Sequence, residues 1–211
     1  MRILIGNQKG GAGKSTLTLL LANYLAIEKR KEVLVLDLDY QASISVKSEK
    51  AKLLENPAPY EVIHGELASY PEMLKTLERY HNQLVIIDLP GKMDDDALIP
   101  VILSGDLIIC PFNYDEFSVD SSLIFAMVCA RINCCAKIIF LPNRIKTTVR
   151  YETRAQVDKA LENLGVVFPE IPDRIDFQRV STIQTPLILR PLVERVLERV
   201  YKEYINPAAD G

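Results

Sequence analysis

Short apolar runs recur along this chain at intervals that leave room for a helix between them. The runs are Ile3–Ile5, Val33–Leu36, Leu84–Ile87, Leu107–Cys110 and Ile138–Leu141. Continuous rather than alternating apolarity is typical of parallel strands that are covered on both faces. Apolar residues with helical spacing predict helices over Ser15–Lys29, Pro71–Tyr80, Asp95–Leu103, Ser118–Ile132, Arg150–Leu164 and Pro186–Ile205.

This alternation predicts an α/β fold: a doubly wound, mostly parallel sheet with helices on both faces and ligands at the carboxyl ends of its strands. The 211 residues suit one such domain with a sizeable core. Because there is no internal repeat and no long linker, residues 1–211 are expected to form a single domain.

A glycine-rich segment with two lysines follows the first predicted strand and opens the first predicted helix. Its backbone N–H groups and the positive end of the helix dipole are suited to a polyphosphate. Lys14 can reach the β- and γ-phosphates, and the Ser15 hydroxyl can bind Mg²⁺. The expected nucleotide contacts are Gly10, Gly11, Ala12, Gly13, Lys14, Ser15 and Thr16.

The ten residues Asn7–Thr16 resemble the deviant Walker A motif of the ParA/MinD family of ATPases. Gln8 stands where the strict P-loop pattern has a glycine, and the Asn-Gln lead-in is similar to the ParA branch. The resemblance implies a P-loop NTPase fold with ATP and Mg²⁺ as cofactors. It also implies that Lys9 crosses a dimer interface to the partner's phosphates, whereas Lys14 serves its own subunit.

Carboxylates follow the second and third apolar runs, where Mg²⁺ and an attacking water are expected to lie. By the resemblance, Asp39 positions the hydrolytic water and lies at the metal, and Asp37 lies near the phosphate loop. Asp88 matches the Walker B carboxylate that holds Mg²⁺ together with Ser15. Residues 94–96 are three aspartates that suit helix capping better than a metal cluster.

The resemblance extends more loosely to the adenine site. Asn143 matches an asparagine that helps to read the base, and an amide offers both a donor and an acceptor for this. Pro172 lies in a segment similar to the loop that closes over the base.

The net charge is −3, but basic residues outnumber acidic ones in residues 131–211. Arg144, Lys146, Arg150 and Arg154 are candidates for a polyanion-facing surface, although a solvated surface explains the charges equally well. The resemblance implies a homodimer with ATP, non-specific DNA binding, and a ParB-like or other adaptor that stimulates hydrolysis, so that a cargo is partitioned or positioned. There is neither a signal peptide nor a run of about 18–20 apolar residues, so a cytoplasmic, nucleoid-associated protein is expected.

Three other classes of protein fit the sequence less well. A MinD-like membrane ATPase needs a basic amphipathic C-terminal anchor, but the apolar stripe within Leu192–Tyr204 is better explained as core packing. A metabolic ligase or kinase, such as a dethiobiotin-synthetase-like enzyme, needs a substrate-binding set that the sequence does not show. An iron–sulfur ATPase needs spaced cysteines; Cys110, Cys129, Cys134 and Cys135 lack such spacing and are expected to be mainly buried thiols.

Overall fold

The computed structural model describes residues 1–54, 56, 58–78 and 83–207. Its strands form one sheet in the order β3-β2-β4-β1-β5-β6-β7, with β8 also paired to β6, and every pairing is parallel. The strands are β1 (Arg2–Ile5), β2 (Val33–Asp37), β3 (Glu61–His64), β4 (Leu84–Asp88), β5 (Leu107–Phe112), β6 (Lys137–Ile145), β7 (Val166–Val167) and β8 (Ile171–Pro172). Because β1 lies between β4 and β5, the loop that follows it opens at the centre of the sheet's carboxyl edge.

Within the residues that the structure describes, seven α-helices connect or flank these strands. They are α1 (Lys14–Asn23), α2 (Ser43–Leu53), α3 (Tyr70–Leu77), α4 (Leu98–Ser104), α5 (Glu116–Ile132), α6 (Arg154–Glu162) and α7 (Arg190–Val200). Both α1 and α7 end in a π-helical turn, at Tyr24–Glu28 and Tyr201–Ile205. Short 3₁₀ segments cover Leu67–Ser69, Ile175–Arg179 and Leu187–Leu189.

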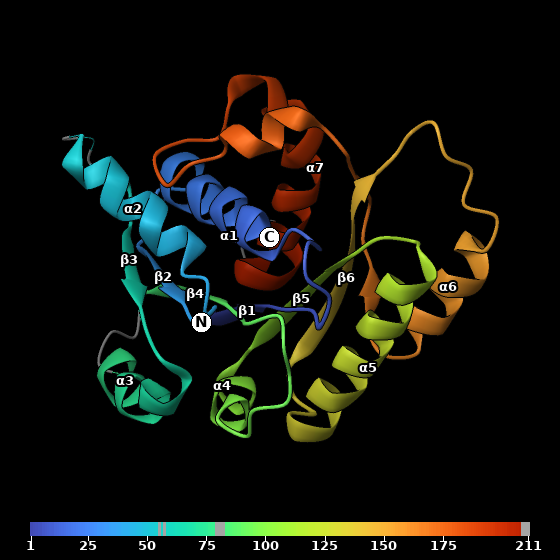
Figure 1. The fold of residues 1–211 in the computed structure, drawn as a ribbon, viewed down its shortest axis with the longest axis horizontal. Coiled ribbons are helices and arrows are strands. Elements are labelled where there is room, and N and C mark those ends of the chain that lie inside the picture. The colour runs from blue at the N-terminus through green and yellow to red at the C-terminus, as the bar shows by residue number, and fades with distance from the viewer. Residues whose placement is uncertain (55, 57, 79–82, 208–211) are drawn as a thin grey trace.

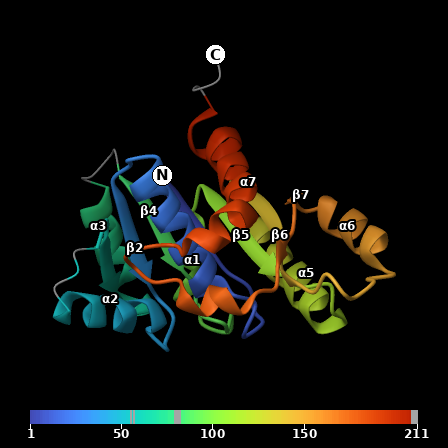
Figure 2. The same ribbon diagram turned by 90° about the horizontal axis from the view of Figure 1, so that it is seen from above.

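The sheet is covered on both faces. Helices α1 and α7 lie on one side, and α3, α4 and α5 lie on the other (Figures 1 and 2). Alternate residues of β1 enter the two cores, since Ile3 and Ile5 pack with α1 and α7 whereas Leu4 packs on the opposite side. This alternation is the period-2 geometry of a strand that is buried on both faces.

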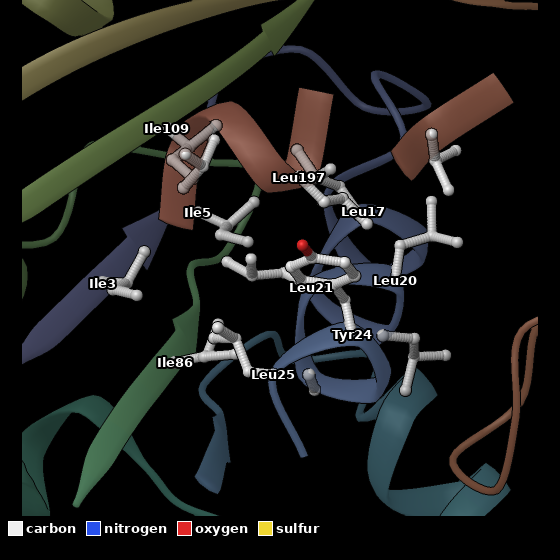
Figure 3. Close-up of a cluster of buried hydrophobic side chains, with 14 of the residues drawn as sticks. Ile3, Ile5, Leu17, Leu20, Leu21, Tyr24, Leu25, Ile86, Ile109 and Leu197 are labelled. Carbon is white, nitrogen blue, oxygen red and sulfur yellow. The ribbon is translucent and has the colours of Figure 1, made fainter. Parts of the chain in front are cut away.

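The first of these cores fixes the position of α1 (Figure 3). Leu17 and Leu21 point from α1 towards Ile5 of β1, and Leu197 approaches from α7. Burying an aliphatic side chain of this size contributes roughly 1.5–3 kcal/mol. Because α1 is packed in this way, the loop that ends at its first residue, Lys14, is held between two rigid elements.

The predicted fold class is confirmed, and each of the five apolar runs forms a strand. The sequence did not predict β3 or α2. Strand β3 lies at an edge with exposed ends, and α2 is mostly polar, so neither carries a continuous apolar signal. The predicted helix end at Tyr80 lies outside the described residues.

Three helix starts and the cysteines correct the sequence-based picture. Helix α7 begins at Arg190 rather than Pro186, because Leu187–Leu189 form a 3₁₀ turn before it. Helix α4 begins at Leu98 rather than Asp95, because the Asp95 side chain accepts a hydrogen bond from the Ala97 N–H (2.9 Å) in the preceding turn. Similarly, α6 begins at Arg154 rather than Arg150. The cysteines were expected to be mainly buried, but only half of them are: positions 110 and 129 are buried, and positions 134 and 135 are exposed.

The C-terminal helix packs as predicted. Its apolar residues Val193, Val196, Leu197 and Val200 are buried in the core on the α1 face. Among the helices of the described residues, none combines the length and apolarity needed to cross a bilayer.

Candidate functional site

The loop between β1 and α1 is fixed at its base by a buried asparagine. The Asn7 side-chain amide donates to the Pro111 carbonyl (2.8 Å) and to the Ser122 hydroxyl (2.9 Å). Its side-chain oxygen accepts from the Lys9 N–H at 3.1 Å. The loop therefore starts from a defined position against β5 and α5.

Two glycines give this loop its curvature. Gly11 and Gly13 have φ values of +78° and +89°, in the left-handed region that side chains with a Cβ rarely adopt. At Gly13 a Cβ would also lie 2.4 Å from the Asn143 amide nitrogen. The curvature of this loop therefore depends on having glycine at positions 11 and 13.

The outer side of the loop is held by two consecutive residues of β6. Asn143 donates from its amide nitrogen to the Ala12 carbonyl, and Arg144 donates from Nη1 to the Gly11 carbonyl, both at 2.9 Å. Asn143 thus supports the phosphate loop, while its predicted role in reading adenine stays a prediction. The contact of Arg144 with the loop was not predicted, since that residue was assigned to a basic surface.

Lys14 is buried at the start of α1, with 7% of its surface exposed. No carboxylate of the described residues forms an ion pair with it. Burying an unpaired ammonium is costly, so its position is best explained by an anionic ligand. Thr18, one turn later, donates to the Lys14 carbonyl (3.1 Å) and to Asp88 Oδ1 (3.3 Å) and so connects the lysine to the strand-end carboxylates.

Asp37 and Asp88 lie side by side at the carboxyl ends of β2 and β4, and both are fully buried. Asp37 Oδ2 accepts from the N–H groups of Ile44 (3.1 Å) and Ser45 (2.8 Å) and from the Ser45 hydroxyl (2.9 Å), so it caps α2. Within the described part of the chain, Asp37 Oδ1 and Asp88 Oδ2 have no hydrogen-bond partner.

The pKa of Asp88 is raised to about 7: burial is the largest cause and the charge of Asp37 adds to it, whereas the Ser15 hydroxyl and Lys14 act in the opposite direction. Two unsatisfied carboxylate oxygens beside a serine hydroxyl are ligands that suit Mg²⁺. The residues present therefore fit a divalent cation near Ser15 and Asp88.

Asp39 lies in the turn after β2, on the same edge, and is half-buried. Its charge contributes to the raised pKa of Asp88, but its Oδ1 accepts a hydrogen bond from the Gln41 N–H at 2.9 Å. Ala42, in the same turn, has a left-handed φ of +48°. The aspartates at 94–96 form no cluster with metal-ligand geometry among the described residues.

A pocket of about 440 Å³ opens between α1 and the segment after β8. Thr16, Leu20, Asn143, Ile175 and Phe177 contribute to its lining, so it offers both apolar surface and an amide. Pro172 itself is not part of the lining; it ends β8 immediately before the lining segment, which begins at Asp173. Of the two residues predicted for the base site, Asn143 lines this pocket, and a role in binding adenine stays a prediction; Ile175 and Phe177 were not predicted.

Lys9 forms an ion pair with Asp115 within its own chain, with 2.5 Å between Nζ and Oδ1. The same carboxylate caps α5 by accepting from the Ser118 N–H at 3.0 Å. The Asp115 contact was not predicted, because it joins residues that are far apart in the sequence.

The chain is similar to a family of nucleotide-binding proteins over most of its length. The family model "CobQ/CobB/MinD/ParA nucleotide binding domain" matches residues 3–187. A curated relative, the maintenance of carboxysome distribution protein A of Gloeobacter kilaueensis, is 31% identical over 112 residues, which cover 52% of this chain and 47% of the relative. The match thus spans about half the length of that relative.

Solved structures share the fold over nearly the whole chain. A protein of Borrelia burgdorferi B31 described as a plasmid partition protein, bound to AMPPNP, has a TM-score of 0.73 at 22% identity, covering 98% of both chains. An ATP complex of McdA from Cyanothece has a TM-score of 0.72 at 18% identity, covering 95% of both chains. The MinD cell division protein of Aquifex aeolicus has a TM-score of 0.68 at 16% identity, covering 96% of this chain and 97% of its own.

Proposed function

This chain belongs to the CobQ/CobB/MinD/ParA family of nucleotide-binding proteins, and from that premise we propose that it is a ParA-like positioning ATPase. In this proposal ATP drives formation of a homodimer that binds DNA non-specifically, and hydrolysis releases it. The observation that carries the proposal is the buried, unpaired Lys14 beside the unsatisfied oxygens of Asp37 and Asp88.

The residues of the phosphate loop would act by position and charge. The amides of Gly10–Lys14 and the Lys14 ammonium would bind the phosphates, and Ser15, Asp39 and Asp88 would hold Mg²⁺, which when bound neutralises phosphate charge. Asp39 would orient the attacking water once it exchanges its contact with Gln41. Lys9 would leave Asp115 and neutralise charge at the partner's phosphates, so that the site is complete only in the dimer.

DNA binding draws support from the basic residues that lack acidic partners. Several cations form ion pairs instead: Arg154 with Glu170, Arg190 with Glu28, and Arg199 with Glu203. No described carboxylate forms an ion pair with Lys146, Arg150, Arg174 or Arg195. These four residues are the best candidates for phosphate contacts, and their number is modest.

The cargo and setting are inferred by similarity alone. One relative is named for carboxysome distribution and one structural neighbour for plasmid partition, so both a protein assembly and a DNA molecule are candidate cargoes. An adaptor similar to ParB would stimulate hydrolysis in either case. We place the protein in the cytoplasm, on the nucleoid. Membrane attachment through α7 is disfavoured, because the apolar residues of that helix are buried in the core.

Nucleotide binding is tested by replacing the buried lysine. Lys14→Ala is expected to lower the affinity for Mg-ATP by more than about 100-fold, because a charge-assisted contact in a buried site is worth roughly 3 kcal/mol. Binding is measured by calorimetry, and the exposed Lys75→Ala, on α3, is the matched control. Unchanged affinity in Lys14→Ala would refute the assigned loop.

The proposed ATP-dependent binding of DNA is tested directly. Asp39→Ala removes the residue proposed to orient the attacking water, so the variant should keep its ATP unhydrolysed. It is expected to bind random-sequence duplex with Mg-ATP but not with Mg-ADP, and the affinity for DNA should fall steeply with salt. Reversing both Lys146 and Arg150 to Glu should weaken this binding, whereas Lys52→Glu on α2 should not. Absence of binding in either nucleotide state would remove DNA from the proposal and leave protein partners as the output.

A further inference from the structure

Two neighbouring side chains of β6 reach the same loop, although successive residues of a strand normally point to opposite faces. Asn143 and Arg144 donate to the consecutive carbonyls of Ala12 and Gly11. The exception has a visible cause, because the register with β8 shifts between Asn143 and Ile145, and Arg144 has a φ of +59°. A bulge of this kind re-aims a side chain.

The backbone of Arg144 is unfavourable for a residue with a side chain, and its surroundings hold it in place. Asn113 donates from its side chain to the Arg144 carbonyl at 3.2 Å. The Arg144 Nε lies 3.5 Å from Oδ1 of Asp173, which lines the pocket of about 440 Å³ beside α1. Arg144 therefore contacts both the phosphate loop and the wall of this pocket.

The direction of a carbonyl determines the direction of the next N–H group. In a trans peptide the two point to opposite sides, and the described chain has no cis peptide bond. The Gly11 carbonyl shares its peptide with the Ala12 N–H, and the Ala12 carbonyl shares its peptide with the Gly13 N–H. Holding both carbonyls outward towards β6 turns both N–H groups away from β6 and into the curve of the loop.

We propose that Arg144 is a positioning residue which, together with Asn143, pre-orients the amides of the phosphate loop for a polyphosphate. The role rests on the nucleotide site proposed above. Arg144 acts through the Gly11 peptide rather than by touching the ligand. Without these two hydrogen bonds, the loop would have to order its peptides when the ligand binds. The entropic cost of this ordering would lower the affinity for the phosphate chain, whatever base is attached to it.

The test compares variants that separate the guanidinium from the backbone strain. Arg144→Gly removes the guanidinium and favours the positive φ, so the fold should keep or gain thermal stability. Affinities for Mg-ATP and for tripolyphosphate, which carries no base, are measured by calorimetry. We expect Arg144→Gly to weaken both by about ten-fold, the equivalent of one directional hydrogen bond to a charged donor.

Three further variants sharpen the result. Arg144→Asn, which tolerates left-handed backbone, should behave like Arg144→Gly and replaces it should the glycine variant not fold. Arg144→Lys keeps the charge but loses the planar fork, and should recover only part of the affinity. Lys137→Ala removes a positive charge at the other end of β6 and should leave both affinities unchanged.

Several outcomes would overturn the role. Unchanged affinity in Arg144→Gly would show that the loop orients without it. A loss for Mg-ATP alone would place Arg144 on the base, and full recovery in Arg144→Lys would reduce its effect to charge. Wild-type protein that binds neither probe would overturn the nucleotide site as well, whereas the first three outcomes leave that site intact.

Discussion

Asp88 is a buried carboxyl group whose pKa is raised by burial to about 7. Between about pH 4 and pH 7 the unfolded chain releases this proton while the folded chain retains it, so the ligand-free fold loses stability as pH rises. Asp88→Asn removes that penalty. We expect it to raise the free energy of unfolding at pH 8 by on the order of 2–4 kcal/mol, and by little at pH 4.5.

Urea denaturation of the ligand-free protein at the two pH values measures this difference. Asp96→Asn, which changes an exposed carboxylate in the same part of the sequence, is the matched control and should have no such pH dependence. Equal stabilisation by Asp88→Asn at pH 4.5 and pH 8 would mean that packing, rather than ionisation, is responsible.

At the scale of the element, α2 is preceded by a residue whose backbone conformation is unfavourable. Ala42 precedes the helix with φ +48° and ψ +36°, a left-handed conformation that costs an alanine roughly 1 kcal/mol or more relative to glycine. Ala42→Gly is therefore expected to raise the free energy of unfolding by about 1 kcal/mol. Ala51→Gly, within the same helix, should lower it by about the same amount, plus the loss of a buried methyl group.

Thermal and urea unfolding of both variants check this prediction. If Ala42→Gly were destabilising, the strain at the start of α2 would be absent in solution.

At the scale of the whole molecule, the proposed dimer depends on Lys9. Lys9→Ala should leave Mg-ATP affinity within about five-fold of wild type, since its contact in this structure is with Asp115 and exposed ion pairs are worth at most about 1 kcal/mol. Dimer formation and hydrolysis should be lost. Light scattering with Mg-ATP on the Asp39→Ala background would then show about 23.8 kDa with Lys9→Ala and about twice that mass without it.

Asp115→Asn is the companion variant, because it frees Lys9 without removing it. It should dimerise at least as well as its parent. If Lys9→Ala lost ATP binding and dimerisation to the same extent, Lys9 would act on the nucleotide of its own subunit and not on that of the partner.

Much of the architecture follows from local pattern. The apolar runs mark strands that are buried on both faces, and the spacing of glycines and lysines marks the phosphate loop, because each signal is contained in a few adjacent residues. Helix α2 carries no such signal, since it depends on capping by the buried Asp37 at the end of β2. Strand β3 forms because β2 offers it an edge.

The missed site residues have the same cause. A positive φ at Arg144 has no sequence marker, because glycine or asparagine is the usual occupant of that conformation. The contacts of Arg144 with Gly11 and of Lys9 with Asp115 join residues more than 100 positions apart. Such contacts are properties of the assembled sheet and not of any one segment.

The exposed thiols at 134 and 135 lie in the turn that leads into β6, at the amino edge of the sheet, whereas the phosphate loop lies at the carboxyl edge. The other two cysteines are buried. A maleimide dye would therefore attach at the end remote from the nucleotide and from the proposed dimer face. With Cys134→Ser, the chain becomes a singly labelled reporter of its own assembly, and no new cysteine is required.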